Sequence, residues 1–203
     1  MVLENWHHGG FTDVFDGLVL LLLHLGEVLL EVVQPEAQGI GQFLGLVCFL
    51  AISVGVCLFL AEDQLYLYVL PMAVLTLADA AAALTGTAYG TRFLRVEEGQ
   101  KSIEGSVAFF TITLLISMMC LMLMTPFAPL NIIILSLMVA GFGTLVEAAS
   151  WRGFDNLFLP VGLLIFLWAH GDSTLPALLW LAGIFALCAI SFRIIAPRFG
   201  LSG

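Results

Sequence analysis

Long apolar runs separated by short polar connections are the feature of this sequence that most limits its possible folds. A helix that crosses a membrane needs about 20 mostly apolar residues. Backbone polar groups find no water inside hydrocarbon, so helices are the expected structure of such runs. The runs cover residues 14–33, 40–60, 65–85, 105–125, 129–149, 157–170 and 174–196.

Composition excludes a water-soluble enzyme, because 61% of the 203 residues are hydrophobic and only 10% are charged. A soluble domain carries about 25% charged residues. We therefore expect one all-α membrane domain over residues 1–203, a polytopic integral membrane helical bundle. It has about seven transmembrane helices, or six if the first run does not span the membrane. That run is the weakest because it contains His24, Glu27 and Glu31.

The net charge is −9, from six Lys and Arg against fifteen Asp and Glu, which argues against nucleic acid as a partner. Seven alternating crossings place all six cations at one membrane face. The positive-inside rule makes this face cytoplasmic. The cations are Arg92, Arg95, Lys101, Arg152, Arg193 and Arg198.

The longest polar connection, residues 86–104, follows a run that contains an acid. Asp79 precedes Gly86 by seven residues, which places it roughly 10 Å below the connection by helical rise. An ionisable group inside a span costs on the order of 2.5–3.5 kcal/mol, and such groups usually have a function. The structural alternative is that Asp79 only joins two helices through a hydrogen bond.

The connection itself has structural and functional interpretations. Gly86 and Gly90 are typical of a helix C-terminus followed by a turn. Ser102 is a good N-cap for the next helix, and Glu104 suits the positive end of that helix. A helix N-terminus beside Lys101 also favours an anion, so capping and anion binding are compatible.

Two further acids fall on the same predicted face. Glu147 ends the run 129–149, and Asp155 with Asn156 follows in the next connection. Mg²⁺ takes one or two carboxylates together with phosphate oxygens, and Lys or Arg neutralises the remaining charge. The pattern favours a metal–polyphosphate site. The alternative for Asp155 and Asn156 is a cap of the short helix that follows.

These residues resemble a known nucleotide-binding signature. Asp79-x-x-Ala82-x-x-x-Gly86-x-x-x-Gly90, followed by Lys101-Ser102-x-Glu104-Gly105, is similar to the CTP-binding signature of the phytol kinase and dolichol kinase family. Glu147 and the Asp155-Asn156 pair resemble that family's downstream acidic positions. The resemblance covers residues 39–160. Phosphatidate cytidylyltransferases share a related arrangement.

The resemblance implies a membrane kinase that transfers the γ-phosphate of CTP, with Mg²⁺, to phytol or a related isoprenoid or lipid alcohol. Its nucleotide region is residues 77–105 with 143–156. Asp79, Glu104 and Glu147 are the implied metal ligands. Lys101 is implied to contact phosphate, and Asp155 or Glu147 to orient or deprotonate the alcohol. The other implied nucleotide-binding positions are Gly86, Gly90, Arg92, Arg95, Ser102 and Asn156.

Three other functions stay open on the sequence. One is synthesis of a CDP-lipid in the manner of the cytidylyltransferases. Another is a small ion-coupled transporter that uses Asp79 and Glu147 as ion sites. The third is an inactive membrane partner, since family members often carry basic residues on an N-terminal helix and no Lys or Arg precedes Arg92 here.

Overall fold

The computed structural model describes residues 40–61, 64–96, 99–149 and 155–195. The chain divides into two compact units, Met1–Cys48 and Phe49–Gly203. The contacts below concern the second unit. The predicted first span and Arg152 and Arg198 lie outside the described residues, so the prediction for them is unchanged.

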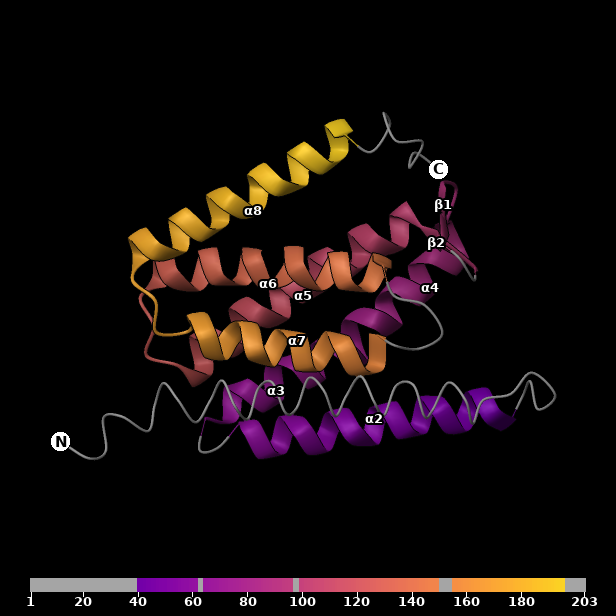
Figure 1. Ribbon diagram of the computed structural model, residues 1–203, viewed down its shortest axis with the longest axis horizontal. Helices are drawn as coiled ribbons and strands as arrows, with labels where there is room; N and C mark the ends of the chain where they lie inside the picture. The colour runs from indigo at the N-terminus through magenta and orange to yellow at the C-terminus, as the bar shows by residue number, and fades with distance from the viewer. Residues whose placement is uncertain (1–39, 62–63, 97–98, 150–154, 196–203) are drawn as a thin grey trace. The chain divides into compact units, whose positions relative to one another are not determined.

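The described residues are almost entirely helical, and the helices follow the apolar runs (Figure 1). Long hydrophobic stretches between short polar connections favour helices. The elements are α2 (Ile40–Leu60), α3 (Leu65–Ala73), η2 (Val74–Ala78), α4 (Asp79–Tyr89), β1 (Phe93–Val96), β2 (Gly99–Ser102), α5 (Ile103–Met124), α6 (Pro129–Ala149), α7 (Asp155–His170) and α8 (Leu175–Ile195).

Three described helical stretches are long and apolar enough to cross a membrane: Leu65–Tyr89, Ile103–Met124 and Pro129–Ala149. Shorter apolar stretches are Val47–Leu60, Asp155–His170 and Leu175–Cys188. The chain is thus a helical membrane protein by the length and composition of its helices. The finer count of seven crossings stays a prediction.

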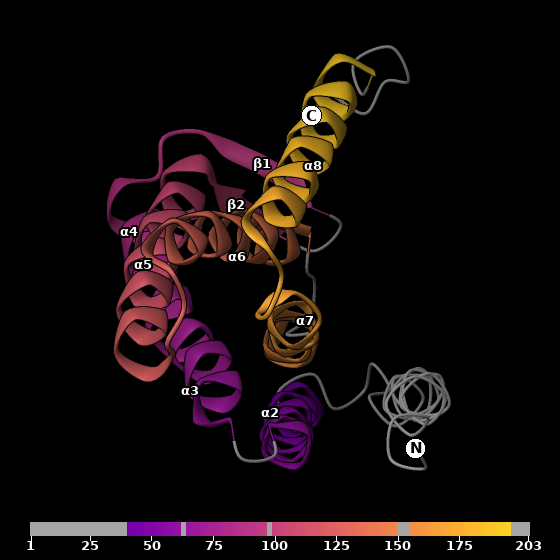
Figure 2. The ribbon, with the colours of Figure 1, turned by 90° about the vertical axis from the view of Figure 1, so that its left-hand side faces the viewer.

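The core of the second unit lies where α5 packs against α6 and against the stretch from α3 to α4 (Figure 2). Helix α7 contacts α3 and α6, and α8 contacts α6. The largest fully buried side chains are apolar, and burying each contributes roughly 1.5–3 kcal/mol relative to water. Examples are Phe109, Leu121, Leu135, Leu163 and Leu167.

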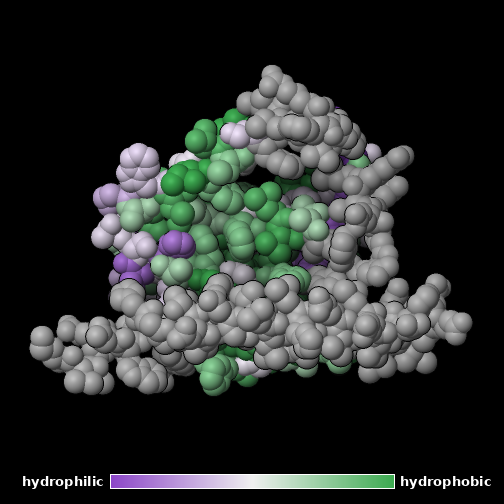
Figure 3. All heavy atoms as spheres, in the orientation of Figure 1, coloured by the Kyte–Doolittle hydropathy of each residue, from purple (hydrophilic) through white to green (hydrophobic). Residues whose placement is uncertain are grey.

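The outer surface of the described helices is also apolar. Figure 3 shows hydrophobic residues over much of the visible described surface. Large side chains stay exposed on every long helix, such as Leu77, Met122 and Trp180. An exposed apolar surface of this extent is unusual for a soluble monomer, whereas hydrocarbon accommodates it.

The connection after Asp79 differs from the sequence expectation. The prediction is one polar segment from 86 to 104, but α4 continues to Tyr89 and an antiparallel β-hairpin fills most of the remainder. Phe93 pairs with Ser102 and Val96 with Gly99. The Ile103 N–H donates to the Arg92 carbonyl at 2.9 Å, which joins the hairpin to α5. The two strands bond each other's backbone N–H and C=O groups. The connection can therefore stay short next to apolar helices.

Candidate polar site at the hairpin end of the helices

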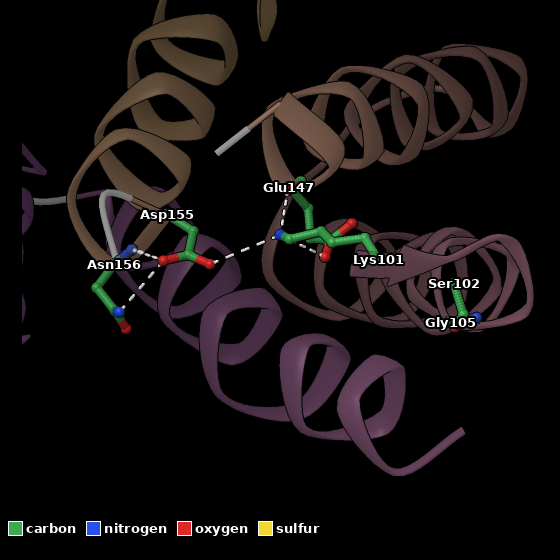
Figure 4. Close-up of polar contacts among 6 residues, drawn as sticks. All are labelled: Lys101, Ser102, Gly105, Glu147, Asp155 and Asn156. Atoms are coloured by element: carbon green, nitrogen blue, oxygen red, sulfur yellow. Dashed lines mark hydrogen bonds and ion pairs between the residues drawn. The ribbon is translucent and has the colours of Figure 1, made fainter. Parts of the chain in front are cut away.

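Lys101 is the central side chain of the candidate site. Strand β2 ends one residue later, and the Lys101 ammonium lies against the end of α6 (Figure 4). It donates to Glu147 Oε1 at 2.7 Å and also to the Glu147 backbone carbonyl. Asp155 Oδ2 lies 3.9 Å from the same nitrogen. One cation on strand β2 therefore joins residues from helices α6 and α7.

The Glu147 carbonyl explains part of this geometry. It is one of the last four carbonyls of α6, which ends at Ala149, and such carbonyls have no partner within their own helix. A cation at a helix C-terminus is favoured both by this hydrogen bond and by the helix dipole. Lys101 thus caps α6 while it pairs with the buried Glu147 carboxylate, whose residue is 6% exposed.

Asp155 begins α7, where the helix dipole favours a negative charge. Its Oδ1 accepts from the Asn156 backbone N–H at 3.1 Å and from the Asn156 side-chain amide at 3.4 Å. Both bonds lie in the first turn of α7, and the predicted capping role stays a prediction. The other oxygen, Oδ2, is the one near Lys101. The carboxylate therefore serves the helix end and the charge cluster together.

Asp79, the first residue of α4, belongs to the same cluster. It is half-buried and lies within Coulomb range of Asp155, Lys101 and Glu147. Lys101, Glu147 and Asp155, from β2, α6 and α7, thus meet, and Asp79 of α4 is within Coulomb range of them. We call Asp79, Lys101, Glu147 and Asp155 the charge cluster. It places the carboxyl groups of Glu147 and Asp155 at one ammonium, with Asp79 within Coulomb range.

Glu104 faces a different set of groups, which departs from the implied metal set of Asp79, Glu104 and Glu147. Glu104 Oε1 accepts from the Thr91 hydroxyl at 2.5 Å, and Oε2 from the Arg92 N–H at 3.5 Å. Glu104 therefore anchors the entry to the hairpin. Among the described residues, no group of three or more His, Cys, Asp or Glu side chains is placed to hold a metal ion by itself.

The glycines of the signature bring α4 and α5 close together. A Cβ on Gly86 would lie 2.7 Å from Ser102 Oγ, and one on Gly105 would lie 2.9 Å from the Ala82 carbonyl. A Cβ on Gly90 would lie 3.0 Å from Ser102 Cβ. The space beside these glycines is filled by the chain itself. Close packing of the chain accounts for their small size here, and the implied approach to phosphate stays a prediction.

The remaining predicted residues have separate outcomes. Ser102 is the N-cap of α5 and accepts from the Gly105 N–H at 3.0 Å, which confirms its predicted cap. Arg92 is exposed at the start of the hairpin. The Arg95 backbone lies in β1, but its side chain is outside the described part of the structure.

Two features of the site were missed by sequence reasoning. Thr91 was not singled out, although it lies directly before Arg92 and bonds Glu104 across the hairpin. A short polar residue beside a strand start carries no specific signal for such a pair. The capping of α6 by Lys101 was also missed, because it joins residues that are 46 positions apart.

No protein-family model, curated protein or solved structure matches this chain.

Proposed function

We propose that this protein is a CTP-dependent lipid-alcohol kinase that acts at the membrane surface. The observation that carries the proposal is the Lys101–Glu147 contact of 2.7 Å, with Asp155 on the same ammonium. This contact brings the basic and acidic positions of the resemblance together. The apolar helices beneath give the site access to a substrate dissolved in the bilayer.

Lys101 is the phosphate ligand in this proposal. Its side chain is 24% exposed, so an incoming triphosphate can reach the ammonium. Phosphate oxygens then take the place of a carboxylate on Lys101, since both are acceptors for the same charge-assisted hydrogen bonds. The positive N-terminal end of α5 lies directly after Lys101 and favours the same anion.

The acids of the cluster fit a nucleotide that carries its own Mg²⁺. The described residues offer no three-acid cage, but Mg²⁺ in such sites needs only one or two protein carboxylates besides phosphate oxygens. Two carboxylates of the charge cluster, Asp79 and Asp155, would hold it. When bound, the metal neutralises charge on the phosphates.

The reaction is a transfer between two oxygens. The alcohol oxygen forms a bond to the γ-phosphorus, the bond from this phosphorus to the β–γ bridging oxygen breaks, and CDP leaves. The proton of the alcohol passes to a carboxylate, for which Asp155 is the better placed. Its side chain is 19% exposed, whereas that of Glu147 is 8% exposed and held by Lys101.

The acceptor is an isoprenoid alcohol such as phytol, and the active face is cytoplasmic. Phosphoryl transfer requires mostly positioning and charge stabilisation, which a rigid helix-end site supplies. A long apolar alcohol lying among the helices places its hydroxyl at the membrane surface. The cationic side chains of the described hairpin end support the cytoplasmic orientation.

The test is transfer of label from CTP to a panel of prenols in membranes that contain the protein. We expect label from the γ-phosphate to enter the lipid and label from the α-phosphate to stay in CDP. Asp79→Asn should lower the rate by about 100-fold, since the acid acts on charge in the transition state. Asp172→Asn is the matched control, because Asp172 is an exposed acid at the opposite helix ends.

Each alternative predicts another result. A CDP-lipid synthase transfers the α-label and releases pyrophosphate. An ion-coupled transporter or an inactive partner transfers no label. Stabilisation by Mg²⁺ and CTP against heat separates the kinase from these two, because a ligand that binds only the folded protein raises its stability.

A further inference from the structure

The membrane-spanning stretch Leu65–Tyr89 contains a π-helical turn directly before Asp79. This turn, η2, covers Val74–Ala78 and separates α3 from α4. A π turn holds one more residue than an α turn, and such turns occur frequently at functional sites. The helix does not end there, so the extra residue changes the direction in which every later side chain points.

Two side chains in and before the turn alter the hydrogen bonds of the helix. Pro71 lies inside α3 and lacks an N–H, so it cannot bond the carbonyl four residues earlier. The Val74 N–H bonds both the Leu70 and the Pro71 carbonyl. The Thr76 hydroxyl donates to the Met72 carbonyl at 2.9 Å and the Ala73 carbonyl at 3.3 Å. The exposed Thr76 hydroxyl is therefore satisfied by its own helix, as hydrocarbon requires.

The extra residue keeps one face of the stretch buried along its length. Leu70, Val74, Ala78 and Ala82 are all buried and recur every four residues. In an uninterrupted α-helix, Ala82 would be rotated by about 120° from Leu70, since each residue turns the helix by roughly 100°. One additional residue in the π turn reduces this rotation by about 100°, so Ala82 stays on nearly the same face as Leu70.

The same arithmetic applies to Asp79. It follows Leu70 by nine residues, which in an uninterrupted α-helix amounts to a rotation of about 180°, away from the buried face. With the π turn, the rotation is about 80°, at the flank of that face. Asp79 is indeed half-buried and within Coulomb range of the other three members of the charge cluster.

We infer that the π turn sets the direction of Asp79 and so brings its carboxylate toward the charge cluster. The inference rests on the proposed function only in naming what Asp79 is positioned for. The geometric part is independent of any activity.

Cysteine cross-linking tests the geometry without an activity assay. In a chain whose four native cysteines are replaced by alanine, Asp79→Cys and Asp155→Cys are joined in membranes by a short bis-maleimide, to which each thiol adds. Trypsin cleavage after Arg92 and Arg152 then separates the two cysteines unless they are linked. The control pair is Asn131→Cys with Ser173→Cys, which is remote from the π turn and joined by a 3.2 Å hydrogen bond in the native chain.

Deletion of Leu77 should convert the π turn into an α turn and leave Asp79 in place, so the 79–155 link should form as in the full-length chain. Insertion of one alanine after Leu77, or deletion of Thr76 and Leu77 together, should reduce the link at least fivefold. The insertion and the double deletion are the two mismatched variants. If one of them also loses the link of the control pair, the 79–155 link in the other variant is the test. The inference would be overturned if a mismatched variant formed the 79–155 link as well as the full-length chain does. It would also be overturned if the Leu77 deletion lost this link while the control pair was still linked.

Rates complete the test. If the kinase proposal also holds, deletion of Leu77 should retain phosphate transfer within about threefold, whereas the mismatched variants should resemble Asp79→Asn. If no variant transfers label but the linking pattern is as expected, the kinase proposal fails and the inference on the π turn stands. A mismatched variant that transfers label at the native rate would contradict the positioning role.

Discussion

The two ends of helices α5, α6 and α7 are closed by different chemistry. At the hairpin end, Lys101 joins β2 to Glu147 and Asp155 through charged contacts. At the other end, neutral groups do the same task. The Asn131 amide donates to the Ser173 carbonyl at 3.2 Å, and the Tyr66 and Phe127 rings pack edge to face with centroids 5.8 Å apart.

The comparison teaches that charge is not required to close this fold. Neutral hydrogen bonds and aromatic contacts suffice where α6 begins and α7 ends. Burying ionised groups near a membrane is costly unless they are paired, and a buried ion pair is weak evidence for stability by itself. The charges at the hairpin end bond the ends of α6 and α7, and binding of a charged ligand is the further role that the proposed function gives them.

The largest expected effect is that of Lys101→Met. Glu147, whose side chain is 8% exposed, then keeps a charge without this counter-ion. Breaking such a pair costs about 2–3 kcal/mol at a site that is still partly open to solvent. Phosphate transfer should fall by at least 100-fold, as measured with labelled CTP.

The double variant Lys101→Met with Glu147→Gln separates the two effects. It removes the uncompensated charge and should recover most of the thermal stability in detergent, while transfer stays lost. Recovery of transfer together with stability would mean that Lys101 serves folding alone, and the contrast between the two ends would disappear.

A smaller effect is expected for close glycine packing, which both ends use. A Cβ on Gly105 would lie 2.9 Å from the Ala82 carbonyl, and one on Gly171 would lie 2.8 Å from the Tyr66 hydroxyl. Overpacking of this kind costs about 1–3 kcal/mol. Gly105→Ala should lower both the unfolding temperature and transfer, whereas Gly171→Ala should lower the unfolding temperature alone.

Gly183→Ala is the control for these two variants, because nothing lies within 4 Å of the added Cβ. Alanine favours helix over glycine by roughly 0.5–1 kcal/mol, so this variant should be as stable as the native chain or more so. If Gly105→Ala were equally harmless, α4 and α5 would not be held at the close distance seen here.

The smallest effect is expected for Asn131→Ala at the neutral end. It removes one partly buried hydrogen bond to the Ser173 carbonyl, which is worth about 0.5–1.5 kcal/mol. The unfolding temperature in detergent should fall by a few degrees, and transfer measured at a temperature where the protein is folded should not change. A loss of transfer as large as that of Lys101→Met would show that the two ends do not differ in role.

Much of the fold could be predicted from local sequence. The bounds of α2 and α6 agree with the apolar runs 40–60 and 129–149, because a continuous apolar stretch in hydrocarbon has to satisfy its backbone as helix. The hairpin could not be read from residues 86–104. Strands pair through backbone bonds, and the short polar segment has no alternating hydrophobic pattern.

The candidate site was predictable in its residues but only partly in its grouping. Residue type and spacing singled out the acids Asp79, Glu147 and Asp155, which are costly inside or beside apolar runs, and Lys101 beside a helix N-terminus. The sequence did not indicate that Glu104 turns to Thr91, nor that Gly86 packs against Ser102. The same small residues suit a phosphate and a neighbouring helix, so spacing alone does not choose between them.

By itself, the sequence determined that this chain forms apolar helices with a few charged residues near their ends, because hydrophobic burial and backbone satisfaction depend on composition along the chain. Only the tertiary structure decided which charges meet. A π turn sets the rotation of Asp79, and helix ends from α6 and α7 converge on one lysine. Contacts of this kind depend on helix rotation and packing, which no local pattern specifies.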